Sequence, residues 1–186
     1  MPIHLPDEIV AEILSPALKV PDDAFSDNSR DSPFAQYSES SSALLLVCKS
    51  WLRVSTPLLY HVVVLRSKGQ AAALERTLKR SPDLGRFIKK LRLEGGFGNP
   101  LQQIIQAAPN VTDLFLPLSI WSDDNAEGLI QGLASMNPNR VILLDNPKIR
   151  FNKNSRRLQD AVKECLKSWG SLVRLSMSLI HGLMKR

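Results

Sequence analysis

Residues 5–14 read Leu-Pro-Asp-Glu-Ile-Val-Ala-Glu-Ile-Leu, and residues 44–52 read Leu-Leu-Leu-Val-Cys-Lys-Ser-Trp-Leu. In the first stretch Leu5, Ile9 and Ile13 recur every four residues, which predicts an apolar stripe along a short helix. The second stretch is apolar on nearly every side, which predicts a helix packed between neighbours. Together they predict a small helical module near the start of the sequence.

The boundaries of the first helix follow from its prolines and acids. Pro6 suits the first helical turn, where no backbone N–H is required, and Asp7 suits the positive end of the helix dipole. We expect the helix to stop at Ser15-Pro16, because proline disfavours helical geometry in the residue before it. Residues 15–42 are acidic and serine-rich, so we expect a mobile insert there. It is either a tolerated surface insertion or a segment regulated by phosphorylation.

The second helix is expected to begin after an N-cap at Ser42 and to run through Trp51. Ser55-Thr56-Pro57 predicts a break and a restart. The next stretch, residues 62–65, is short and rich in β-branched side chains, which predicts a strand. We therefore divide the chain into a first module over 1–62 and a second domain over 63–186.

The second domain repeats a loose unit: an amphipathic helix, a Pro or Gly break and a short strand. The expected helices span 71–79, 101–108, 126–136 and 158–169, and the expected strands span 87–93, 111–116, 141–144 and 172–177. The period of roughly 23 to 31 residues lies near that of leucine-rich repeats. Such units bury their apolar faces only by stacking on their neighbours.

The motifs Leu-Pro-x-Glu-Ile-x-x-x-Ile-Leu (residues 5–14) and Leu-x-Val-Cys-Lys-x-Trp (residues 45–51) resemble the F-box. This small helical module docks a substrate receptor onto the Skp-type adaptor of a cullin–RING ubiquitin ligase. Carried over by matched position, the implied adaptor-binding residues are Leu5, Pro6, Ile9, Leu45, Val47, Cys48 and Lys49. The other reading is that they are core residues of a helical bundle, and we expect Ile13, Leu46 and Trp51 to hold the helices together. The insert at 15–42 is longer than the usual link of the family.

The later units resemble the irregular leucine-rich repeats found behind the F-box in fungal-type proteins. The expected fold class is thus α+β to α/β, with an F-box module followed by a short leucine-rich-repeat-like solenoid, which is either short by nature or truncated. Because strand side chains alternate, outward positions follow from an inward Leu91 and Leu93. The implied target-binding residues are Arg92, Glu94, Asp113, Phe115 and Arg174. Phe115 either anchors a partner or packs under a neighbouring loop, and residues 141–144 alternate too poorly to assign a face.

Catalytic and metal-binding patterns are sparse. The three histidines, His4, His61 and His181, are isolated in sequence, and Cys48 and Cys165 lack zinc-ligand spacing. The glycine-rich segment 94–99 is either a phosphate cradle or a strand-to-helix turn, and it lacks a complete phosphate-binding motif. Asp123-Asp124 is either an acid pair or an exposed loop before a helix. We expect no enzyme, no metal and no cofactor.

Charge is unevenly distributed, because residues 1–42 hold eight acids against two bases and residues 137–186 hold eleven bases against three acids. The basic region is either a solvated face or a surface for nucleic acid. No apolar run approaches the roughly 20 residues of a membrane span, and no secretion signal is expected. Two cysteines fit a reducing cytoplasmic or nuclear compartment.

The function implied by the resemblance is that of a non-catalytic substrate-recognition subunit. Its partners would be the Skp-type adaptor, the ligase and an unknown target protein, with no membrane. The alternatives are a basic repeat protein that binds nucleic acid and an adaptor-bound scaffold with no role in degradation.

Overall fold

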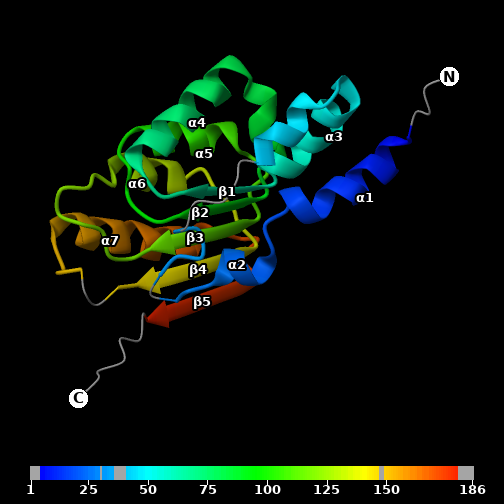
Figure 1. The fold of residues 1–186 in the computed structure, drawn as a ribbon. Coiled ribbons are helices and arrows are strands. Elements are labelled where there is room, and N and C mark those ends of the chain that lie inside the picture. The colour runs from blue at the N-terminus through cyan, green and yellow to red at the C-terminus, as the bar shows by residue number, and fades with distance from the viewer. Residues whose placement is uncertain (1–4, 30, 36–40, 147–148, 180–186) are drawn as a thin grey trace.

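The computed structural model describes residues 5–29, 31–35, 41–146 and 149–179 (Figure 1). His4 and His181 lie outside these ranges. Five strands form one parallel sheet in which their spatial order equals their order in the chain. The strands are β1 (Val62–Leu65), β2 (Lys90–Leu93), β3 (Asp113–Pro117), β4 (Arg140–Asp145) and β5 (Arg174–Leu179).

Helices connect the strands and lie on one face of the sheet (Figure 1). The connecting elements are α4 (Lys68–Arg80), the short 3₁₀ helix η2 (Pro82–Phe87), α5 (Pro100–Ala107), α6 (Glu127–Leu133) and α7 (Lys153–Ser168). Parallel strands need such crossovers, because a tight turn reverses the chain direction. The expected mixed class of helices and strands is confirmed.

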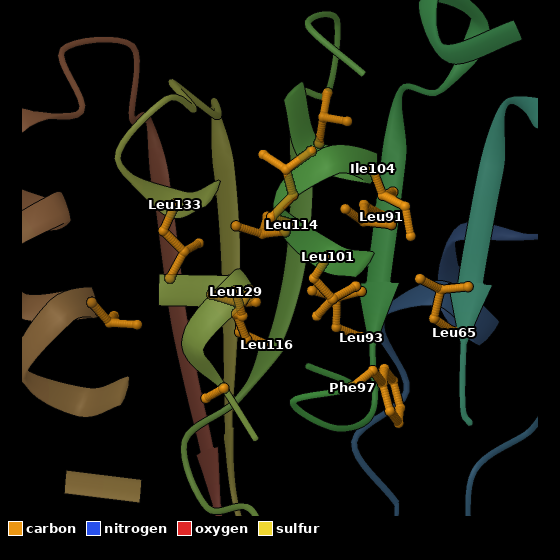
Figure 2. Packing of buried hydrophobic residues seen from close by; sticks show 14 of the residues in the cluster. Leu65, Leu91, Leu93, Phe97, Leu101, Ile104, Leu114, Leu116, Leu129 and Leu133 are labelled. Atoms are coloured by element: carbon orange, nitrogen blue, oxygen red, sulfur yellow. The ribbon is translucent and has the colours of Figure 1, made fainter. Parts of the chain in front are cut away.

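The core lies between the sheet and these helices. Val63, Leu91, Leu114 and Val141 are register partners in successive strands, so their side chains form one apolar ladder on the helix face. Figure 2 shows the strand leucines facing side chains of α5 and α6, including Leu101 and Leu129 of the helices. Leu91, Leu93, Leu114 and Leu116 are fully buried, as expected from strand alternation.

The other face of the sheet is also covered. Phe115 and Ile142 are register partners that pack there with Val62 and with Phe25 of α2 (Asp22–Ser26). Figure 1 shows α2 on the face opposite α4–α7. Both faces of β4 are therefore apolar, which explains why residues 141–144 show no clean alternation.

The first helix does not stop at Ser15-Pro16. Helix α1 spans Asp7–Leu18 and carries Pro16 inside it. The helix buries Val10, Leu14 and Leu18, a stripe of period four that continues past the proline. Tertiary packing of this stripe outweighs the hydrogen bond that Pro16 removes.

The expectation of a mobile insert over residues 15–42 is wrong for much of that range. Residues 15–18 belong to α1, and α2 buries Phe25 completely against the sheet. Residues 36–40 lie outside the described part of the chain.

The second helix also differs from expectation. A 3₁₀ helix, η1 (Ser41–Leu46), is followed by α3 (Lys49–Tyr60), which runs without a break through Pro57. The chain bends between them, because Cys48 has extended backbone and serves as the N-cap of α3. Helix α3 also contacts η2 and β1, which links it to the sheet.

Candidate functional site

Helix α1 divides its apolar side chains between two sides. Val10, Leu14 and Leu18 are buried in a cluster that includes Trp51 and Leu58 of α3. On the other side are three apolar residues between 43% and 56% exposed, namely Leu5, Ile9 and Ile13. The predicted stripe therefore exists, but it faces solvent.

The junction of η1 and α3 presents a second exposed apolar group. Leu46 is 86% exposed and Val47 is 59% exposed, while Cys48 and Lys49 are exposed and Leu45 is half-buried. We call the exposed side chains of α1 and this junction the docking face, comprising Leu5, Ile9, Ile13, Leu46 and Val47. Free apolar groups of this kind mark interaction surfaces.

The docking face rests on a packed three-helix unit. Arg53 of α3 forms an ion pair with Asp7 of α1, with 2.6 Å between Nη2 and Oδ1. Trp51 is half-buried in the cluster, as expected. Ile13 and Leu46, which we expected to hold the helices together, are exposed instead, because the stripe of Val10 and its neighbours performs that role.

The sequence-predicted target-binding residues gather on the sheet face opposite the helices. Register pairs Lys90 with Asp113, Asp113 with Arg140, and Arg140 with Arg174 across four strands. Arg92 pairs with Phe115 in the same way. The alternation that placed these residues on one face is therefore correct.

Most of this face is not open to solvent. Residues 20–29 and 31–34, which we call the strap, lie across it and carry α2. Arg92 is 2% exposed and Phe115 is fully buried, so the expectation of outward, accessible side chains is wrong for both. Phe115 packs under a neighbouring segment, the second of the two readings from sequence.

Arg92 connects the sheet to the strap. Its Nη1 donates to the carbonyl oxygens of Ala24, Phe25 and Asp27 at 3.3, 2.8 and 2.7 Å. Its Nε donates to Glu94 Oε1 at 2.8 Å, which compensates the buried charge. The guanidinium carbon lies 4.0 Å from the Phe115 ring centre, a stacked cation–π arrangement.

Glu94 collects further contacts at the end of β2. Its carboxylate also accepts from Ser32 Oγ of the strap at 2.7 Å and from Arg66 Nε at 3.1 Å. Arg66 in turn donates to the Phe34 carbonyl oxygen. Glu94 is thus a mostly covered junction between sheet and strap rather than a free outward carboxylate.

Asp22 forms the second polar connection. Its Oδ1 lies 2.6 Å from Lys90 Nζ, and Arg140 Nη1 lies 2.9 Å from both carboxylate oxygens. The hydrogen bond from Lys90, together with that from Arg140, holds the pKa of the Asp22 carboxyl below its ordinary value. Asp113 also faces Arg140, at 3.4 Å, and is half-buried, whereas Arg174 is exposed.

Sequence reasoning missed the strap residues Asp22 and Phe25. The available signal was weak: Val20 and Phe25 are large apolar residues in an otherwise polar and acidic stretch. Such residues favour packing against another element over free movement in solvent.

The glycine-rich loop after β2 already holds an anion from the chain itself. Asp124 accepts hydrogen bonds from the Gly96 N–H at 2.6 Å and from the Phe97 N–H at 3.0 Å. Phe97 and Gly98 have φ of 46° and 72°, so the loop uses left-handed backbone. The internal carboxylate satisfies the donors that a phosphate would need, which favours the structural turn over the cradle.

Among the described residues, no three His, Cys, Asp or Glu side chains come together in a possible metal site. Burial, with nearby lysines, lowers the pKa of His61 and favours its neutral form. Within the same residues, no helix is long and apolar enough to span a bilayer.

No family model, curated protein or solved structure matches this chain.

Proposed function

We propose that the chain is a non-catalytic substrate-recognition subunit. It docks on the Skp-type adaptor of a cullin–RING ubiquitin ligase through the docking face, and the sheet domain binds a target protein. Catalysis is then by proximity, since the subunit holds the target near the transferring enzyme. Its place of action would be the cytoplasm, the nucleus or both.

The observation that carries this proposal is the exposure of the docking face. Leu5, just before α1, and Ile9 and Ile13 on α1 form an apolar stripe exposed to water, whereas Val10, Leu14 and Leu18 of the same helix are packed. Leu46 and Val47 add exposed apolar area at the adjoining η1–α3 junction. Fully burying an exposed side chain of this size contributes about 1.5–3 kcal/mol, and each of these side chains, which are 43% to 86% exposed, can contribute a corresponding part. Together they give this face the capacity for stable association.

Binding of the purified chain to a Skp-type adaptor, measured by calorimetry, tests the proposal. We expect Leu5→Asp combined with Ile9→Asp to weaken binding by at least about 100-fold, because two apolar contacts are lost and two charges are introduced. Val173→Asp is the matched control, since Val173 is 87% exposed and lies immediately before β5, outside the docking face. It should bind as the natural chain does.

Circular dichroism keeps folding separate from binding in these variants. Both altered residues are about half exposed, so the helical signal should be unchanged. Unaltered adaptor affinity in the folded double variant would refute the proposal. Failure of the natural, folded chain to bind the adaptor would refute it as well.

The scaffold alternative differs only in outcome for the target. Loss of the docking face would leave target abundance in cells unchanged for a scaffold, and would raise it for a recognition subunit.

The geometry gives little support to nucleic-acid binding by the basic region. Three of the cations on α7 are ion-paired: Arg157 with Glu127 at 2.6 Å, Lys167 with Glu164 at 2.7 Å, and Lys163 with Asp160 at 3.6 Å. Salt-dependent binding to DNA or RNA at physiological ionic strength would nevertheless establish it.

A further inference from the structure

The strap occupies the sheet face that the proposed target-binding residues share. Phe25 is fully buried against Val62, Phe115 and Ile142, which belong to β1, β3 and β4. Asp22 reaches β2 and β4 through Lys90 and Arg140. A segment near the start of the chain therefore covers four consecutive strands.

The surface under the strap has a definite chemistry. Arg92 stacks on the ring of Phe115. Lys90 and Arg140 lie at the next position along this face, on either side of Asp113, so the face places cations beside an aromatic ring. The strap supplies the complementary groups, because it brings carboxylates and one deeply inserted phenylalanine. Its Asp22 lies three residues before Phe25, and in α2 this spacing places both side chains on one side of the helix.

Several features make the strap separable from the sheet. Its helix has only five residues, and Val20 and Phe25 are the residues that it contributes to the apolar cluster on this face, while the Phe34 ring lies 5.4 Å from the Arg92 guanidinium carbon. The Asp22 side chain remains 54% exposed although it makes two ion pairs. A pocket of about 140 Å³ lies between the strap and the strand ends, lined in part by Ser29, Ser32 and Ser119.

The main core does not depend on the strap. The strap cluster is separate from the large cluster between sheet and helices, which includes Leu91, Leu114 and Leu129. The sheet thus keeps its packing on α4–α7 when the strap leaves. Local openings of this kind occur at lower free energy than global unfolding.

We propose that the strap is an internal occupant of the target-binding surface and that acidic peptide segments with the pattern Asp-x-x-Phe bind there in its place. The carboxylate would take the position between Lys90 and Arg140, and the phenyl ring would take the position against Phe115. The inference rests on the proposed function only in identifying such a segment as part of the target. Binding of the segment to the sheet is independent of the adaptor.

A labelled synthetic peptide with the sequence of residues 19–35 is the probe, and fluorescence anisotropy with the full chain is the measurement. The change Asp22→Lys removes two ion pairs and places a third cation beside Lys90 and Arg140. It should therefore weaken strap docking, although the hydrogen bonds from Arg92 to the strap carbonyl groups remain. We expect this variant to bind the peptide at least 10-fold more tightly than the natural chain. A peptide carrying both Asp22→Lys and Phe25→Ala should not bind.

Asp23→Lys is the matched control because it makes the same charge change one residue away. The Asp23 carboxylate accepts from the Ala24 N–H and forms no ion pair with any residue in the described ranges. This variant should bind the peptide as weakly as the natural chain does. Equal affinity for the natural chain and the Asp22→Lys variant would overturn the proposal, as would absence of binding to the folded Asp22→Lys variant.

Hydrogen exchange provides the second readout. In the Asp22→Lys variant, amides of α2 should exchange faster while those of β2–β4 keep their rates. Equal acceleration in strap and sheet would show that the two are not separable, which would overturn the proposal. Adaptor binding is measured on the same variant. If the variant binds the peptide but not the adaptor, the proposed adaptor docking is refuted and the strap proposal stands. If it binds the adaptor but not the peptide, the strap proposal is refuted and the adaptor docking stands.

Discussion

Replacing Arg92 with methionine tests how the strap is attached. Methionine keeps an unbranched apolar stem but removes the guanidinium, which is 2% exposed. Three strap carbonyl groups then lose their shared donor, and Glu94 loses one of its three partners. Each of these groups was satisfied by a charged donor in a covered position, where an unmade hydrogen bond is costly.

The expected loss in free energy of unfolding is about 3 kcal/mol. Breaking one partner of a buried ion pair costs about 3–5 kcal/mol, and the lower end applies because Glu94 keeps its contacts with Ser32 and Arg66. The loss also has a ceiling. If Arg92→Met makes the docked strap unfavourable, the strap can detach from the sheet. The loss in free energy of unfolding therefore cannot exceed the free energy that strap docking contributes.

Equilibrium unfolding in urea, followed by circular dichroism and tryptophan fluorescence, measures this loss. Arg174→Met is the matched control, since Arg174 is exposed and should show no measurable change. A double-mutant cycle with Glu94→Gln should be less than additive, because the two side chains share a hydrogen bond. A loss below about 1 kcal/mol for Arg92→Met would refute the idea that this guanidinium attaches the strap.

Three further predictions concern packing and pH. Trp51→Ala should lower the free energy of unfolding by about 3 kcal/mol, the lower end for tryptophan truncation because the side chain is half-buried; urea unfolding checks it. Gly85→Ala should cost at least about 2 kcal/mol, because a β-carbon there would lie 1.9 Å from the Ala107 carbonyl oxygen, whereas Gly170→Ala meets nothing within 4 Å and should leave the calorimetric Tm unchanged. Because the pKa of Asp22 is lowered, its contribution to strap docking is complete above the ordinary pKa of 3.8 and is lost as the pH falls further. NMR signals of the Phe25 ring should show this transition, and Asp22→Asn should abolish it.

The sheet domain was predictable because its local patterns agree with its packing. Leu91 and Leu93 alternate with charged side chains, and Leu114 and Leu116 are spaced in the same way one strand later, on either side of Phe115. Each of the strands β2 to β5 follows a helix and a Pro or Gly break, so the order of these elements was available from periodicity. The ambiguity at residues 141–144 was itself informative, since that strand is covered on both faces.

The orientation of α1 was not predictable from period alone. Leu5, Ile9 and Ile13 recur every four residues, and so does the stripe that begins at Val10 and continues through Leu14. Only the position of α3 decides which stripe is buried. Leu5 and Ile9 are exposed, whereas the expected packing of Ile13 between the helices does not occur.

The strap could not be predicted because its contacts are distant in sequence. Asp22 meets Arg140 across 118 positions, and nothing within the acidic stretch indicates that partner. Composition predicted a mobile segment, since low hydrophobicity usually leaves too little apolar area to offset ordering. Phe25 works against that expectation, because it enters an apolar site built by residues of β1, β3 and β4.

The distance between the strap and its last contact has a consequence during synthesis. The ribosome makes Asp22 early, but its partner Arg140 follows 118 residues later. At about 5–20 residues per second this interval is on the order of 10 s. The strap is synthesised before the sheet but docks only after β4 is made. For that time the nascent chain exposes both the acidic segment around Phe25 and an incomplete sheet.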